Sequence, residues 1–115
     1  MAYLDFVVAT TDKLVIQNLF NYPNPFTEGT NFVFDHNQSG KQLDIRIQIF
    51  NSAGALVKTI ETDITPESYR STPIKWDGST DGGGKIAGGF YVYRLIVKNP
   101  EGDTSYDQSK LVYIR

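Results

Sequence analysis

The sequence WDGSTDGGGKIAGGFYVY, residues 76–93, contains the densest group of glycines in the chain and runs directly into its most apolar segment. Glycine tolerates the backbone angles of tight turns, whereas the aromatic and β-branched residues that follow favour strands. We therefore expect a Gly-rich hairpin over 77–89, between a short strand at 73–77 and a longer strand at 90–99. The short strand directs Ile74 and Trp76 inward.

The strand expected at 90–99 is apolar on both faces. Tyr91, Tyr93, Leu95 and Val97 alternate along one face, and Phe90, Val92 and Ile96 lie on the other, interrupted by Arg94. In a half-exposed sheet one face is normally polar. This strand is therefore either central in the core or covered on its outer face by something else.

Short alternating runs predict further strands on both sides of this stretch. Residues 42–50 show the clearest alternation, because Asp44, Arg46 and Gln48 separate the aliphatic residues at 43, 45, 47 and 49. That pattern is typical of a strand with one buried and one solvated face. Asn51–Gly54 has the composition of a four-residue hairpin loop. The other expected strands are 3–10, 14–21, 30–36, 55–61 and 106–115, and 62–72 is expected to cross between sheets.

About seven or eight short strands, without a helix of normal length, predict an all-β fold, an immunoglobulin-like two-sheet antiparallel β-sandwich. The 115 residues fit one domain. We expect that domain at 11–115. Residues 1–10 are interpreted as a residual strand from a preceding domain, with Met1-Ala2 as a cloning start, and such a strand predicts possible strand exchange in a homodimer of the isolated chain.

Composition excludes several classes of function. The formal charge is −2 and no basic stripe is present, so we expect no nucleic-acid partner. Cysteine is absent, which excludes disulfides, a thiolate nucleophile and Cys-based zinc sites. Apolar runs are too short to span a bilayer, so direct membrane insertion is not expected. No cofactor or metal is predicted.

Residue patterns that carry chemistry are sparse. His36 is the only histidine, and no serine lies in a nucleophile-elbow pattern, so we expect a loop histidine at a strand end and no catalytic site. Asp77, Ser79 and Asp81 alternate before Gly82, as in a fragment of a calcium loop. Capping of turns by the two aspartates is the simpler interpretation, and the alternative stays open.

The segment Asn21–Phe26, NYPNPF, contains Pro23 and Pro25 and therefore cannot pair centrally in a sheet. We interpret it as a stiff corner with Tyr22 and Phe26 anchored in the core, although a polyproline ligand is an alternative. Asn37-Gln38-Ser39 matches a glycosylation sequon. A glycan-binding face is a further alternative, because the chain has seven tyrosines, but packing in the core explains them as well. They are at positions 3, 22, 69, 91, 93, 106 and 113.

Four segments in order carry a family resemblance: NYPNPF at 21–26, IQIFNSAGALVKTI at 47–60, WDGSTDGGGKIAGGFYVYRL at 76–95 and KLVYIR at 110–115. With these segments the chain resembles the C-terminal sorting domains of the type IX secretion system, which are related to the immunoglobulin-like domain of flagellar hook-capping proteins. FVVA running into NYPNPFTEGTNFVFDHN is most similar to the C-terminal domain of the type IX sortase, a gingipain-like clan CD cysteine peptidase of the Bacteroidetes surface.

The resemblance implies a non-catalytic module of an exported cell-surface protein. Its partners would be the secretion machinery and an outer-membrane β-barrel shuttle or attachment protein, and the peptidase Cys and His would lie upstream. Docking needs an exposed strand edge or an apolar patch, and the final strand is our candidate because its edge is expected to be open. The predicted partner-binding residues are Lys110, Leu111, Val112, Tyr113, Ile114 and Arg115. The alternatives are a structural hook-capping-like module and a glycan-binding accessory domain of a secreted hydrolase.

Overall fold

The computed structural model describes residues 13–115, which form seven strands and no helix. The strands are β1 (Ile16–Tyr22), β2 (Thr30–His36), β3 (Leu43–Asn51), β4 (Leu56–Ile64), β5 (Ile74–Trp76), β6 (Gly89–Lys98) and β7 (Thr104–Tyr113). Each lies within about three residues of a strand expected from sequence patterns. The strand expected at 3–10, the interpretation of 1–10 as a remnant, and strand exchange through it lie outside the described residues.

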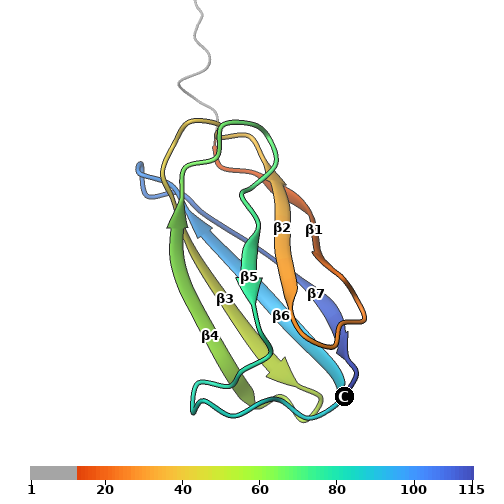
Figure 1. Cartoon of the computed structure of the whole chain (residues 1–115). Helices are drawn as coiled ribbons and strands as arrows, with labels where there is room; N and C mark the ends of the chain where they lie inside the picture. The colour runs from red at the N-terminus through yellow and green to blue at the C-terminus, as the bar shows by residue number, and fades with distance from the viewer. Residues whose placement is uncertain (1–12) are drawn as a thin grey trace, which may run out of the picture.

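The strands form two antiparallel sheets, one in the order β1-β2-β5 and the other in the order β4-β3-β6-β7 (Figure 1). β1 and β7 approach each other across one side of the sandwich. β4 stays beside β3 and does not cross to the sheet of β5, so the larger sheet has four strands. The prediction of an immunoglobulin-like β-sandwich is confirmed.

The core lies between the sheets and follows the period of two. Phe32 and Phe34 of β2 are fully buried, as are Tyr93 and Leu95 of β6. The aliphatic residues at 43, 45, 47 and 49 of β3 are buried too, whereas Asp44 and Arg46 are exposed. β6 is central in its sheet, between β3 and β7, which explains its continuous apolar inner face.

The hairpin between β3 and β4 forms as expected. The Asn51 N–H donates to the Ala55 carbonyl over 2.9 Å, and the Gly54 N–H donates to the Asn51 carbonyl over 2.9 Å. Gly54 has a φ of 87°, which favours glycine. The side chain of Asn51 also accepts hydrogen bonds from the Ala53 and Ala55 N–H groups, so the loop is closed by its first residue.

The expectation of a hairpin at 77–89 is wrong. β5 belongs to the three-stranded sheet and β6 to the four-stranded sheet, so this segment crosses between sheets. Residues 65–73 also cross, as expected for that part of the chain. A period-two pattern shows which face of a strand is buried but not which sheet the strand joins. A hairpin and a crossing between sheets can both be rich in glycine, so composition does not distinguish them.

β1 departs from the expected alternation at a bulge. The register with β2 shifts between Gln17 and Phe20, and Asn18 has a φ of 55°. The bulge reverses the side of the sheet to which later side chains point. Leu14 is therefore buried in the core, whereas Phe20, expected on the same side, is only partly buried beside Arg70 on the outer surface.

Candidate interaction surface

The final strand is bonded on both of its edges over 110–113, and the bonding of one edge continues to Ile114. β6 pairs with one edge, from Gly89 opposite Tyr113 onward. On the other edge the Phe26 N–H donates to the Val112 carbonyl over 3.0 Å, and the Ile114 N–H donates to the Phe26 carbonyl over 2.9 Å. The NYPNPF segment thus adds a short parallel bridge to β7, at the C-terminal end visible in Figure 1.

The side chain of Asn24 closes the rest of this edge. Its amide donates to the Lys110 carbonyl over 3.1 Å and its carbonyl oxygen accepts from the Val112 N–H over 3.0 Å. A carboxamide can replace a neighbouring peptide group in this way because it offers the same donor and acceptor. The Asn24 amide also lies 3.2 Å from Oδ1 of buried Asn21.

Asn21 links this corner to the core. Its amide donates to Oγ1 of Thr30 over 3.0 Å, and its Oδ1 accepts from the Tyr93 hydroxyl over 3.1 Å. Burial raises the pKa of Tyr93 to about 12, so the phenol is a donor at neutral pH. The polar residues of NYPNPF therefore satisfy buried groups, and its conformation depends on β2 and β6.

Phe26 joins three of the segments that carried the family resemblance. Only 1% of it is exposed, and its ring centroid lies 5.7 Å from that of Trp76 and 5.1 Å from that of Tyr113. The prediction that Phe26 anchors the corner is confirmed. Tyr22 is 47% exposed and stacks on Phe20 at 6.0 Å, so its prediction as a core anchor is wrong, because the alternation of β1 places it on the outer side.

The predicted partner-binding residues therefore divide into two groups. Leu111 and Tyr113 are buried in the core, while Lys110, Ile114 and Arg115 are exposed and Val112 is partly exposed. The backbone edge of Lys110–Ile114 is not open, contrary to expectation, since Asn24 and Phe26 occupy it. Contact through the exposed side chains stays a prediction.

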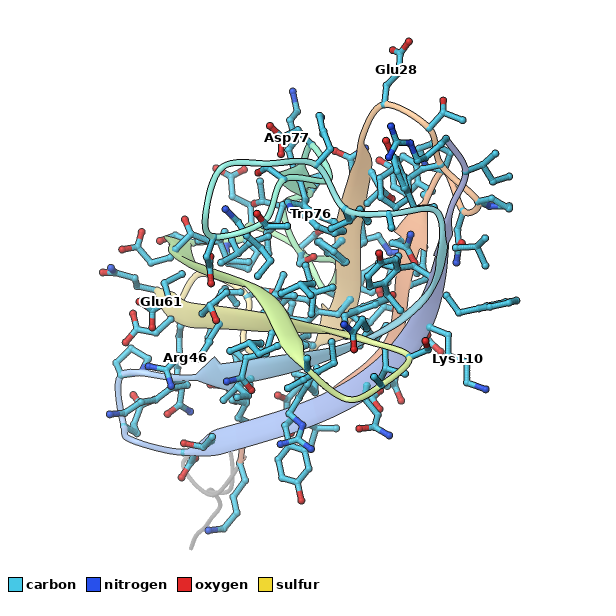
Figure 2. The ribbon with its side chains drawn as sticks, turned by 90° about the horizontal axis from the view of Figure 1, so that it is seen from below. Glu28, Arg46, Glu61, Trp76, Asp77 and Lys110 are labelled. Atoms are coloured by element: carbon cyan, nitrogen blue, oxygen red, sulfur yellow. The ribbon has the colours of Figure 1, made fainter. Side chains whose placement is uncertain are left out.

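A groove opens on the other side of the sandwich, between the outer edges of β4 and β5. Its volume is about 770 Å³, and its walls include Lys58 and Glu61 of β4 together with Lys75 and Asp77. Figure 2 shows Glu61, Trp76 and Asp77 around this side. Trp76 is only 4% exposed, and both charge signs line the groove, so it offers neither a stacking platform nor a single-sign binding site.

Turns and side-chain hydrogen bonds shape the Gly-rich crossing. Oδ1 of Asp77 accepts from the Ser79 N–H over 2.9 Å, so Asp77 caps an Asx-type turn as proposed. Asp81 instead accepts from the Thr59 N–H over 3.2 Å and lies 3.9 Å from Nζ of Lys58. The two aspartates serve different partners, and within residues 13–115 no group of three or more acidic, His or Cys side chains could hold a metal ion.

His36 is the last residue of β2 and is 6% exposed, so it is a buried residue and not a loop histidine. Its Nδ1 accepts from the Gln38 N–H over 3.0 Å, while Nε2 is buried with no hydrogen-bond partner among the described residues. Burial lowers the pKa of His36. No serine hydroxyl is bonded to it within the part of the chain that the structure describes, which gives it no nucleophile to activate.

An ion pair that sequence patterns did not reveal lies beside His36. Asp35, which is 5% exposed, accepts from Nε of Arg70 over 2.9 Å and from the Asn18 amide over 2.9 Å. The hydrogen bond from Arg70, followed by that from Asn18, lowers the pKa of Asp35. The bulge at Asn18 and the crossing segment that carries Arg70 bring these residues together, and neither was foreseeable from spacing.

Exposed aromatic residues lie on both sheets: Phe90 and Tyr106 on the four-stranded sheet, and a short row on the side of the three-stranded sheet. Tyr22 stacks on Phe20, and Cζ of Arg70 lies 5.3 Å from the Phe20 ring and 5.7 Å from the Tyr69 ring. Tyr91 and Tyr93, by contrast, are buried. At the predicted glycosylation sequon, Asn37 already accepts from the Val15 N–H and donates to the Lys13 carbonyl.

A scan against protein-family models finds no match, and no curated protein matches the sequence. Among solved structures the chain is similar to dimeric latent PorU from Porphyromonas gingivalis, with 29% identity and a TM-score of 0.75 over 96% of this chain. The chain spans only 10% of that protein. It also shares its fold with part of a β-glucuronidase of Parabacteroides merdae, at 8% identity and a TM-score of 0.59 over 88% of this chain and 13% of that one.

CopC from Methylosinus trichosporium has the same type of fold, at 15% identity and a TM-score of 0.51 over 84% of this chain and 93% of that one. Similarity at this level of identity concerns the fold alone. Along residues 13–115, no helix has the length and apolar character of a membrane span.

Proposed function

We propose that this chain is a non-catalytic targeting and docking domain of an exported cell-surface protein, most similar to the C-terminal part of the type IX sortase. The domain directs the protein that carries it through the type IX machinery and attaches it to an outer-membrane β-barrel partner. The chemistry of the peptidase belongs to another part of such a protein.

One observation carries this proposal: the similarity to PorU extends over 96% of this chain at 29% identity, with a TM-score of 0.75. PorU is the type IX sortase, so this structural similarity agrees with the resemblance carried by the sequence. The similarity involves only 10% of PorU, which supports a role as one module of a larger protein. The bonded pair of NYPNPF and the final strand gives a structural reason for the two segments to occur together.

The test is removal of residues 14–115 from the protein that carries this chain, in its native host. We expect the truncated protein to accumulate in the periplasm, measured by protection from protease added to intact cells. Arrival at the surface in normal amount would refute the proposal. Removing 110–115 alone is a poor test, because it also removes buried Leu111 and Tyr113.

A point variant tests the predicted contact residues without disturbing the core. Ile114 is 49% exposed, and Ile114→Asp should reduce attachment of the exported protein to the outer membrane. Val15 is 52% exposed and bonded to Asn37 at the other end of the sandwich, so Val15→Asp is the matched control. Equal attachment of the two variants would remove Ile114 from the proposed contact.

A second candidate function, glycan binding, has one observation in its favour. Tyr22 and Tyr69 are 47% and 62% exposed and flank the Phe20–Arg70 pair on a single sheet face. Exposed tyrosines of this kind can stack on sugar rings. A glycan array with no binding above that of Tyr22→Ser would count against it.

A further inference from the structure

The outer face of the four-stranded sheet carries a continuous apolar patch. Phe50 lies opposite Leu56 on one neighbouring strand and opposite Val92 on the other, and Phe90 lies opposite Val112. Phe90 is 69% exposed and Leu56 47%, and the other three are partly exposed. We call these five residues the outer-face patch. Contiguous exposed apolar side chains of this kind mark interaction sites.

Two cations on this face lie beside the apolar patch and apart from its carboxylates. Arg94 and Lys110 border the outer-face patch, and both are exposed. Neither forms a salt bridge within residues 13–115, unlike Arg46, which pairs with Glu61 over 2.9 Å. Figure 2 shows Lys110 at the opposite end of the sheet from Arg46 and Glu61.

The acidic residues of the face lie at that opposite end. Asp44 lies directly opposite Asp63 on β4 and Lys98 on β6, and Glu61, on the same face of β4, pairs with Arg46, so the carboxylates of this end already have cations beside them. The patch therefore borders unpaired cations, and the nearest concentration of carboxylates is some distance away along the sheet. A complementary surface would be apolar and would carry carboxylates beside the apolar contact.

This charge pattern argues against a second copy of the chain as the occupant. A twofold axis through the outer-face patch would bring Arg94 and Lys110 of both copies together, and like charges at an interface are unfavourable. A twofold axis through the centre of the sheet would instead place apolar residues over Asp44 and Asp63, which would lose water without gaining a partner.

A lipid surface fits less well for a related reason. Arg94 and Lys110 would attract anionic headgroups, but a flat sheet face laid on a bilayer would also bring Asp44, Glu61 and Asp63 to the same headgroups. Proteins that lie on a membrane usually do so through an amphipathic helix, and the residues around the patch are all in strands.

We propose that the outer-face patch is the docking surface for a protein partner that presents apolar side chains next to carboxylates. Phe90 is the central apolar contact, since it is the most exposed member and projects from a central, doubly paired strand. Arg94 and Lys110 select the acidic partner and orient it. This inference rests on the proposed docking function and assigns it a surface that includes Lys110 and Val112 of the predicted final-strand site.

The first step of the test is photocrosslinking in the native host. p-Benzoylphenylalanine replaces Phe90 in the protein that carries the chain, and Tyr22 is replaced in the control because it is an exposed aromatic residue on the other sheet. We expect one protein to be crosslinked at position 90 and not at position 22. Equal crosslinking at both positions, crosslinking to a second copy, or crosslinking at position 22 alone would overturn the inference.

The second step measures binding of the crosslinked protein after its purification. Phe90→Ser, Arg94→Glu and Lys110→Glu should each weaken Kd about tenfold or more, the change expected for a contact residue at an interface. Tyr22→Ser should leave Kd unchanged. The two charge variants should also reduce the salt dependence of binding.

Three controls make the result decisive. Thermal unfolding should show that Phe90→Ser retains the fold, because a change at an exposed position has little effect on stability. Binding of the wild type to phosphatidylglycerol vesicles, lost in Arg94→Glu, would overturn the inference in favour of a lipid. If removal of 14–115 blocks surface attachment but all patch variants bind normally, only this inference fails and the proposed function stands.

Discussion

Replacement of Asn24 by alanine should release one edge of the final strand. The side chain makes two hydrogen bonds to the β7 backbone, at Lys110 and Val112, and one to Asn21. Each such bond contributes about 0.5–1.5 kcal/mol to stability, and Asn24 is exposed, so water can replace part of the loss. We expect Asn24→Ala to lower the free energy of unfolding by about 1–2 kcal/mol.

The global measurements are urea unfolding, which gives the free energy of unfolding, and thermal unfolding, in which a loss of about 1–2 kcal/mol should lower Tm by roughly 4–12 °C for a domain of this size. The local measurement is more specific. The Val112 N–H donates to Oδ1 of Asn24, so its hydrogen exchange should become about five- to thirtyfold faster than in the wild type. Hydrogen exchange of the Val97 N–H, in the central strand β6, should become faster only by the amount that the loss of global stability accounts for.

Asn24→Asp separates the two halves of this interaction. Aspartate keeps the acceptor for the Val112 N–H but places a second acceptor against the Lys110 carbonyl, where the amide now donates. Exchange at Val112 should therefore remain slow in Asn24→Asp although overall stability falls. Unchanged exchange at Val112 in Asn24→Ala would refute the assignment of Asn24 as the group that closes this edge.

Four other perturbations have defined outcomes. Phe26→Ala should destabilise the domain by about 3–5 kcal/mol in denaturant unfolding, because it removes a buried ring that contacts two others. Gly78→Ala should cost about 1–2 kcal/mol in the same assay, because Gly78 has a φ of 83°. Arg70 lowers the folded-state pKa of Asp35, so the stabilising effect of that carboxylate is complete above its unfolded pKa of about 3.9 and is lost as pH falls through the folded-state value. Asp35→Asn should therefore be less stable than wild type at pH 7, with a difference that shrinks in acid. Burial also lowers the pKa of His36, so this side chain binds a proton more readily in the unfolded state than in the folded state. Stability should therefore fall as pH drops below the unfolded pKa of about 6.5, and His36→Gln should reduce this pH dependence.

Controls and contrary results follow from the same features. Phe90→Ala is matched to Phe26→Ala, because Phe90 is 69% exposed and should cost little. A loss for Phe90→Ala as large as that for Phe26→Ala would contradict the packing described. A wild-type stability that is level between pH 7 and pH 5 would contradict the burial of a neutral His36, and a constant difference for Asp35→Asn down to pH 2 would contradict its ion pair.

Much of the fold was predictable because local alternation reports burial directly. Asp44 and Arg46 alternate with aliphatic residues in β3, and the structure places them on the solvated face as expected. The reversal at β1 was not predictable, since Asn18 gives no sequence signal for a bulge that changes the exposure of Phe20. Membership of a sheet was equally hidden, which is why the segment at 77–89 was expected to be a hairpin.

The interaction surface was predictable only in outline. Apolar residues on both faces of the strand at 90–99 predicted either a central position in the core or a covered outer face, but not which neighbours complete the patch. Phe50 joins it through its register with Val92, which depends on pairing between distant segments, and a bulge in the hairpin sets Leu56 opposite Phe50. Asn24 bonds to Val112 of the final strand, 88 positions further along the chain. No local sequence pattern reports a contact over that separation.

The glycine-rich stretch at 76–93 shows where the division falls. Its composition alone determined a turn-rich connection followed by a buried strand, because glycine conformations and side-chain alternation are properties of neighbouring residues. Only the tertiary structure decided that the connection crosses between sheets, that Asp77 and Asp81 serve different partners, and that Trp76 packs on Phe26. These contacts depend on which segments meet in space, and that is set by the packing of the two sheets as a whole.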